Sequence, residues 1–94
     1  MAGFEWDPVK ERKNIQERGL DFTTASRIWD GLVLEKIDNR QDYGETRIMA
    51  FGKVNERLLA VLFTWRGADR RIISARRANR REQRRFEAET DSLG

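Results

Sequence analysis

The densest concentration of chemically useful side chains lies near the end of the chain, between Arg66 and Arg85. Nine arginines stand there against two acidic residues, so this segment carries a net charge of +7, although the whole chain carries only +3. Guanidinium groups make planar, bidentate contacts with oxyanions, and phosphate is the commonest such group in a cell. The segment therefore predicts a surface that binds nucleic acid.

Three of these arginines are our candidates for a catalytic role in RNA cleavage: Arg76, Arg77 and Arg80. When a ribose 2′-hydroxyl attacks the neighbouring phosphate, negative charge develops on the phosphate oxygens, and fixed guanidinium groups can stabilise it. Removing one preorganised donor of this kind costs about 10²–10³ in rate in known enzymes. Because side chains alternate along a strand, we expect Arg76 and Arg77 to point to opposite faces of a sheet.

Proton transfer is the second requirement of this chemistry, and the chain has no histidine to supply it. The remaining groups are carboxylates, lysines and Tyr43, and our candidates are Glu82, Lys10 and Lys53. Glu82 has a simpler interpretation as a helix-capping residue, because it follows Asn79 by three positions.

Further contacts to RNA are expected from residues outside the arginine segment. Lys10, Asn14 and Arg18 are spaced by four residues on a predicted helix and so share one face, which a solvated surface helix explains equally well. Tyr43 lies in a polar loop, where it could stack on a base or anchor its own loop. The complete set of predicted RNA-binding residues is Arg18, Asn14, Lys53, Arg81 and Tyr43.

Composition excludes several classes of protein. The 94 residues suffice for one small domain, which we place at 1–90 with a disordered tail at 91–94, and 38% hydrophobic residues argue against disorder of the whole chain. Without cysteine and histidine the chain lacks a disulfide framework and the usual zinc ligands, and we expect no cofactor and no metal. No apolar signal region or membrane-spanning run is present, so we expect a cytoplasmic protein without membrane contact.

The elements that must position these residues can be read from their start and stop signals. Asp7 and Pro8 predict the start of a helix that ends at Gly19, and Asp21 predicts a second helix that runs to about residue 30. Period-two patterns predict strands over 32–37, 46–54, 58–65 and 71–75, after a short extended piece at 4–6. Asn79 and Glu82 predict a closing helix over 80–89.

The predicted fold is therefore α+β: an antiparallel sheet of four to five strands, with two N-terminal helices packed on one face and a C-terminal helix after the last strand. The strand at 58–65 is the most apolar, which places it in the middle of the sheet. Predicted core aromatic residues are Trp29, Trp65, Phe51 and Phe63, and Trp6 and Asp7 are expected to pack and to cap a helix.

Four stretches, in this order, resemble the BrnT toxins of the RelE-like group of small ribonucleases: FEWDPVK, the helix end from Asn14 to Gly19 followed by DF, GETRIMAFG, and RRIISARRANRREQRRFE. The resemblance implies a RelE-like fold, a type II toxin–antitoxin pair, metal-independent cleavage of mRNA, free or on the ribosome, and inhibition of translation. It also implies neutralisation by a BrnA-like ribbon-helix-helix antitoxin, through which the complex binds operator DNA.

Two positions depart from the pattern of this family. Arg18 stands where the family usually has histidine, and Phe86 stands where it usually has tyrosine. Arginine does not exchange protons near neutral pH, and phenylalanine lacks a hydroxyl. The alternative to an active nuclease is therefore a noncatalytic protein that binds nucleic acid or docks the antitoxin after its nuclease activity has lapsed.

Overall fold

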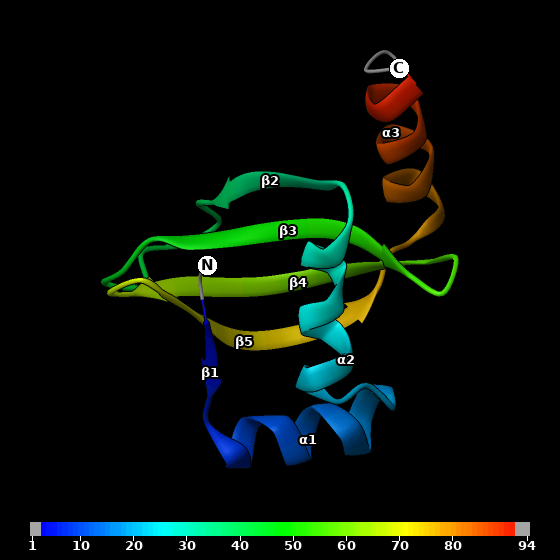
Figure 1. Ribbon diagram of the computed structural model, residues 1–94. Helices are drawn as coiled ribbons and strands as arrows, with labels where there is room; N and C mark the ends of the chain where they lie inside the picture. Colours follow the sequence, from blue (N-terminus) through cyan, green and yellow to red (C-terminus); the bar gives the residue numbers. More distant parts are fainter. Residues whose placement is uncertain (1–2, 92–94) are drawn as a thin grey trace.

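The computed structural model describes residues 3–91 as an α+β domain (Figure 1), which confirms the predicted fold class. Most of the disordered tail predicted for 91–94 lies outside the described residues, but Asp91 is helical. In chain order the elements are β1 (Phe4–Trp6), α1 (Pro8–Arg18), α2 (Phe22–Ser26), the short 3-10 helix η1 (Arg27–Asp30), β2 (Val33–Asp38), β3 (Arg47–Val54), β4 (Arg57–Arg66), β5 (Asp69–Arg77) and α3 (Arg80–Asp91).

The five strands form one sheet in the order β1-β5-β4-β3-β2, and β4 lies in its middle as its apolar sequence predicts. Strands β2 to β5 are antiparallel neighbours, because short loops join them. The expectation of a wholly antiparallel sheet is wrong at one edge, where β1 pairs in parallel with β5. The sixty-odd residues between these two strands give the chain room to return in the same direction.

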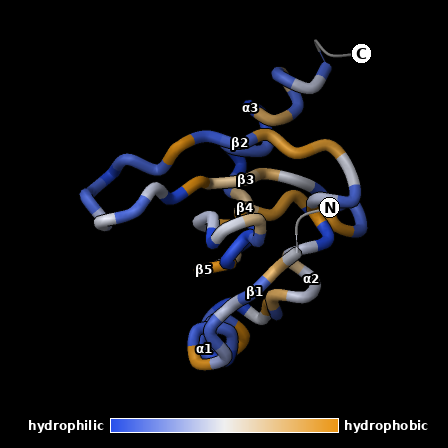
Figure 2. Tube along the Cα trace, turned by 60° about the vertical axis from the view of Figure 1, so that its left-hand side comes forward, coloured by the Kyte–Doolittle hydropathy of each residue, from blue (hydrophilic) through white to orange (hydrophobic). Residues whose placement is uncertain are grey.

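The main core lies between one face of the sheet and the segment α2–η1. Phe22, Ala25 and Ile28 from this segment are fully buried against side chains such as Val61 and Phe63 of β4. Their spacing is the helical spacing that the sequence shows. Figure 2 shows the same division by hydropathy, with apolar residues along the central strands and hydrophilic residues over most of α1, α3 and the loop between β2 and β3.

Helix α1 begins and ends where the sequence predicts. The Asp7 side chain accepts a hydrogen bond from the Val9 amide (2.9 Å), and Pro8 occupies the first turn, where no donor is lost. Gly19 ends the helix in the left-handed conformation at φ 70°, which a residue without a Cβ adopts most easily. Trp6 packs edge-on against Phe22, as expected of a packing residue.

Helix α3, which follows the last strand as predicted, covers the face of the sheet opposite to the one that α2 covers. Phe86 of α3 packs with Leu58 and Ala78, and Leu34 and Phe51 extend this second cluster. Strand alternation explains the arrangement, because Phe51 and Leu58 point away from the face that α2 covers. We call this second surface the α3 face.

Among the aromatic residues predicted for the core, Phe63 is fully buried and Trp29 and Phe51 are half-buried. Trp65 is 43% exposed, so its assignment to the core is wrong. It lies near the end of β4, beyond the cover of η1, where its ring contacts Phe63 and the guanidinium of Arg70.

Candidate nucleic-acid interface

The strand register brings distant residues together on the α3 face. Leu34, Phe51, Ala60 and Arg76 form one row across four strands, because each is the partner of the next. In the next row along the strands, Lys36 is the first member, and Met49, Leu62 and Ser74 follow it. The α3 face thus combines an apolar middle with cationic side chains at its edges.

Arg76 is held by a bidentate ion pair. Its two terminal nitrogens donate to the two carboxylate oxygens of Glu82 at 2.8 Å and 2.9 Å, and one of them also contacts the Arg77 carbonyl at 3.3 Å. The hydrogen bond to Glu82 raises the pKa of Arg76, although desolvation and nearby Arg40 oppose the rise. Arg76 therefore presents a permanently charged group in a fixed plane.

Glu82 has a structural role that opposes its predicted role in proton transfer. Besides pairing with Arg76, its carboxylate accepts from the Asn79 amide (2.9 Å), while the Glu82 amide donates to the Asn79 side chain (2.8 Å). These are the two bonds of the predicted capping box. The hydrogen bond from Arg76 lowers the pKa of Glu82, whereas a general base needs a pKa nearer neutrality. We therefore assign Glu82 to positioning.

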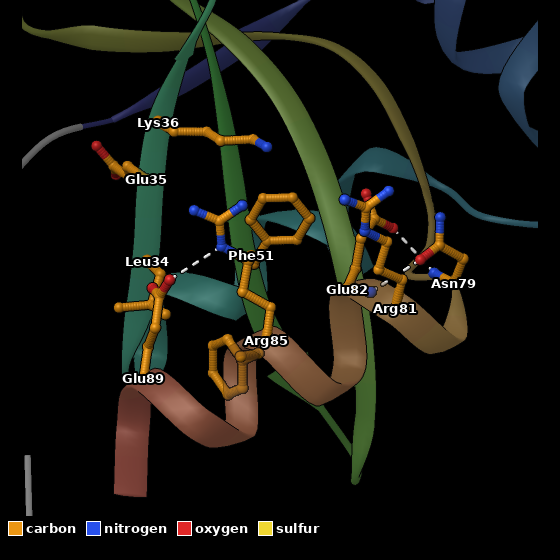
Figure 3. Close-up of a pocket in the computed structure, with 10 residues that line it drawn as sticks. Leu34, Glu35, Lys36, Phe51, Asn79, Arg81, Glu82, Arg85 and Glu89 are labelled. Atoms are coloured by element: carbon orange, nitrogen blue, oxygen red, sulfur yellow. Dashed lines mark hydrogen bonds and ion pairs between the residues drawn. The ribbon is translucent and has the colours of Figure 1, made fainter. Parts of the chain in front are cut away.

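Two hollows lie beside Phe86. The larger, of about 490 Å³, lies between α3 and strands β2 and β3, with Leu34, Phe51 and Phe86 as its apolar lining (Figure 3). The smaller, of about 280 Å³, lies between α3 and the turn that joins β3 to β4. Together they make the α3 face a concave surface around the base of α3.

The predicted site residues divide between these hollows. Arg81 and Glu82 line the larger one, while Arg77 and Lys53 line the smaller one beside Phe86. The Lys53 ammonium lies 6.0 Å from the centre of the Phe86 ring. Arg80 is exposed at the start of α3 and lines neither hollow.

The predicted row on α1 does not join this surface. Asn14 is 5% exposed, and its amide nitrogen donates to the Leu20 carbonyl (2.8 Å) while its oxygen accepts from the Ala75 amide (3.1 Å). Both of its polar ends are occupied inside the protein, which leaves neither for the RNA contact that the sequence predicts. Lys10 and Arg18 are exposed but line neither hollow, and Figure 1 places α1 and α3 on opposite sides of the sheet.

The loop between β2 and β3 carries cationic side chains that were not predicted to belong to the site. The buried Asp38 carboxylate accepts from Arg40 at 2.7 Å and 2.9 Å, and these bonds lower its pKa to about 2. Tyr43 also donates to Asp38 (3.2 Å), and the Arg47 guanidinium lies 4.0 Å from the centre of the Tyr43 ring. Tyr43 therefore anchors its own loop, the structural alternative that the sequence left open.

Lys36 belongs to the α3 face by register, and the electrostatic effects of Lys36 and Arg40 place both cations near the pair of Arg76 and Glu82. The charge of Lys36 helps to lower the pKa of Glu82, and the charge of Arg40 acts on Arg76. In the sequence, the alternating positions of Leu34, Lys36 and Asp38 indicate that these side chains share one face of a strand. Only the pairing of β2 with β3 shows which face of the sheet they share.

No cluster of carboxylates that could hold a metal ion occurs within residues 3–91. In that same range, no helix is long and apolar enough to cross a membrane.

Comparison with known proteins gives the family. The model of the family described as "Ribonuclease toxin, BrnT, of type II toxin-antitoxin system" matches residues 6–82. The chain belongs to the BrnT family. A crystal structure of the Brucella abortus ribonuclease toxin BrnT is similar with a TM-score of 0.63 and 27% identity, covering 85% of this chain and 100% of that one. A search of curated proteins finds no match.

Membership of the BrnT family confirms the resemblance that the sequence motifs indicate. It makes the chain a member of a family of ribonuclease toxins from type II toxin–antitoxin systems, for which an antitoxin is the expected partner. The matched range includes Arg76, Arg77 and the capping box of α3, and ends at Glu82.

Proposed function

We propose that this BrnT-family chain cleaves mRNA without a metal ion and thereby inhibits translation, on free or ribosome-bound message, with the RNA strand lying across the α3 face. The observation that carries the proposal is the guanidinium of Arg76, which is fixed by its pair with Glu82, and Glu82 lines the larger hollow together with the cations Lys36 and Arg81. A guanidinium held in place before the reaction stabilises developing charge without reorganisation.

In the proposed reaction the 2′-oxygen bonds to phosphorus while its proton leaves to solvent water, and the bond from phosphorus to the 5′-oxygen breaks. Arg76 stabilises the extra charge on the phosphate oxygens. Arg77 pairs in register with Leu59 of the other face, as strand alternation predicts, and takes part from the rim, where it lines the smaller hollow. The 5′-oxygen takes a proton from Lys53, the lysine that shares the smaller hollow with Arg77. Glu82 holds Arg76 in place and transfers no proton.

The proposed partner is a BrnA-like ribbon-helix-helix antitoxin with an acidic segment that covers the α3 face. Charge complementarity supports this choice, because the arginine segment from Arg66 to Arg85 is strongly basic. Operator DNA would then be bound by the antitoxin, and the toxin would act in the cytoplasm.

The test is Arg76→Ala, with Arg84→Ala as a matched control on the exposed side of α3. We expect Arg76→Ala to lower RNA cleavage in the presence of a chelator by about 10²–10³ and to relieve growth inhibition on expression. The control should retain both activities. Full toxicity of Arg76→Ala, with its unfolding temperature close to that of the wild type, would show that the site lies elsewhere.

The second candidate is a noncatalytic protein that binds nucleic acid or docks the antitoxin. The lowered pKa and the three hydrogen bonds of the Glu82 carboxylate favour it, because the carboxylate that pairs with Arg76 is unsuited to proton transfer. Both candidates bind RNA with an affinity that falls as salt rises. Only the nuclease yields fragments, so intact RNA after prolonged incubation would decide for the noncatalytic protein.

A further inference from the structure

The larger hollow has an apolar lining that faces outward. Phe86 is 7% exposed, whereas Phe51 is half-buried and presents part of its ring to the hollow. Figure 3 shows the Phe51 ring pointing into the space between β2 and α3, with Lys36 and Arg85 on either side of it. At about 490 Å³ the hollow is within the size range of small-molecule sites, so a flat ring system fits it.

Some charged side chains at the rim of this hollow are paired within the protein, and others remain to bind a ligand. Glu82 is paired with Arg76, and Glu89 is paired with Arg85 at 3.0 Å. Lys36 and Arg81 form no ion pair with any other described residue, although the Lys36 ammonium lies 5.9 Å from the centre of the Phe51 ring. Glu35 also lines the hollow, but its carboxylate accepts a hydrogen bond from the Trp29 indole (3.2 Å), and its register partner is Ala50 of the main core on the other face. The spare charge that faces the hollow is therefore positive.

We propose that the larger hollow holds one unpaired nucleobase of an RNA strand, stacked on Phe51, with the flanking phosphates on Lys36 and Arg81. The inference rests on the proposed function for the presence of RNA and adds the place where a base is bound. Asn79 also lines the hollow, and because its oxygen serves the cap of α3, its amide hydrogens remain for the edge of the base.

A single-stranded nucleic acid is the occupant that this combination favours. Such strands bind where aromatic rings accept bases by stacking and neighbouring cations follow the backbone. The hollow also adjoins Arg76 through Glu82, which lines it and pairs with Arg76. A base seated on Phe51 would thus lie beside the phosphate that Arg76 contacts. The acidic antitoxin segment proposed above would also pair with these cations, so the feature that favours a base is the aromatic face of Phe51 beside them.

The first experiment uses the full-length protein and a short single-stranded RNA that carries 4-thiouridine and 2′-O-methyl groups, which prevent attack by the 2′-oxygen. After irradiation, tryptic peptides are mapped by mass spectrometry. We expect cross-links in the peptide 48–53, which contains Phe51, or in the peptide 86–94, which begins with Phe86. This measurement needs no variant.

The second experiment measures affinity for the same RNA and for an abasic strand of equal length. Phe51→Leu keeps an apolar side chain but removes the aromatic face. We expect about fivefold to tenfold weaker binding of RNA, because one stacked base is lost, and unchanged binding of the abasic strand. Trp65→Leu is the matched control, since Trp65 is an exposed aromatic residue away from the hollow, and it should leave both affinities unchanged.

The outcomes separate the two proposals. RNA binding that is equal in wild type and Phe51→Leu, with cross-links outside both peptides, overturns the base-binding hollow and leaves the proposed function standing. Absence of RNA binding by the wild type overturns both. If Phe51→Leu instead weakens only the complex with the cognate antitoxin, the hollow belongs to that partner and the inference is wrong.

Discussion

Replacing Asn14 by alanine tests whether a polar residue predicted to bind RNA acts inside the fold instead. Its side chain joins three parts of the chain: the helix α1 that carries it, the Leu20 carbonyl after that helix, and the Ala75 amide of β5. The Ala75 amide lies on a stretch of β5 beyond its pairing with β1, which extends over Arg70–Ile72 only. Asn14 thus supplies an acceptor where the sheet supplies none.

The expected loss can be worked from these bonds. Leaving the Ala75 amide buried without a partner costs about 1–3 kcal/mol, and the partly exposed Leu20 carbonyl adds a smaller amount because water can reach it. The better helix propensity of alanine returns about 0.5 kcal/mol. The net loss of about 1–3 kcal/mol is a large fraction of the roughly 5–15 kcal/mol that stabilises a small domain. For a domain of this size it corresponds to a fall in unfolding temperature of about 5–20 °C.

The assay is thermal unfolding by circular dichroism, paired with RNA binding at a temperature where every variant is folded. Gln16→Ala is the matched control, because Gln16 is an exposed polar residue on the same helix, and it should change stability by less than about 0.5 kcal/mol. RNA affinity should be unchanged in both variants. If Asn14→Ala unfolds at the same temperature as the wild type and binds RNA more weakly, the structural role of Asn14 is refuted.

Three further predictions follow from other parts of the molecule. Arg18→His restores the residue that the family resemblance implies and should raise RNA cleavage in vitro; an unchanged rate would show that this position does not limit the reaction. Gly52→Ala should destabilise the fold by about 1–3 kcal/mol in thermal unfolding, because a Cβ there would lie 2.8 Å from the Ile28 Cβ. Equal stability of Gly52→Ala and wild type would contradict that close approach. The pKa of Asp38 is lowered from 3.8 to about 2, so its pair with Arg40 should stabilise the fold fully above pH 3.8 and less as pH falls toward 2. Asp38→Asn should therefore lose less stability over that pH range than the wild type, and parallel acid-unfolding curves would count against the pair.

Much of the fold could be predicted because its signals are local. Asp7 and Pro8 start α1 and Gly19 ends it through contacts within about one helical turn at each end, and the capping box of α3 occupies four consecutive positions. The central place of β4 follows from an apolar run that covers both of its faces. The parallel pairing of β1 had no such signal, because it joins segments more than sixty residues apart.

The site was predicted less well because its residues are assembled by strand register. Asn14 has a polar side chain of a type that usually lies at the surface. Only its partner Ala75, 61 positions away, explains its burial. Lys36 and Arg40 lie outside the arginine segment, so charge density along the sequence did not identify them. Trp65 is aromatic in an apolar strand, yet helical cover ends before it and leaves it exposed.

On the α3 face, different residues attract the RNA and orient hydrogen-bond donors toward it, although the basic sequence segment suggests one set of residues for both tasks. Arg76 and Glu82 form a pair of opposite charges, so their site contributes little net attraction for a polyanion but offers donors in a fixed orientation. Lys36, Arg81 and the cations of the smaller hollow have the opposite character, because they are exposed and supply net positive charge. Counterion release then assigns the salt dependence of RNA binding to these exposed cations. The rate of cleavage depends instead on the geometry of Arg76, which salt screens less because the pair is partly buried.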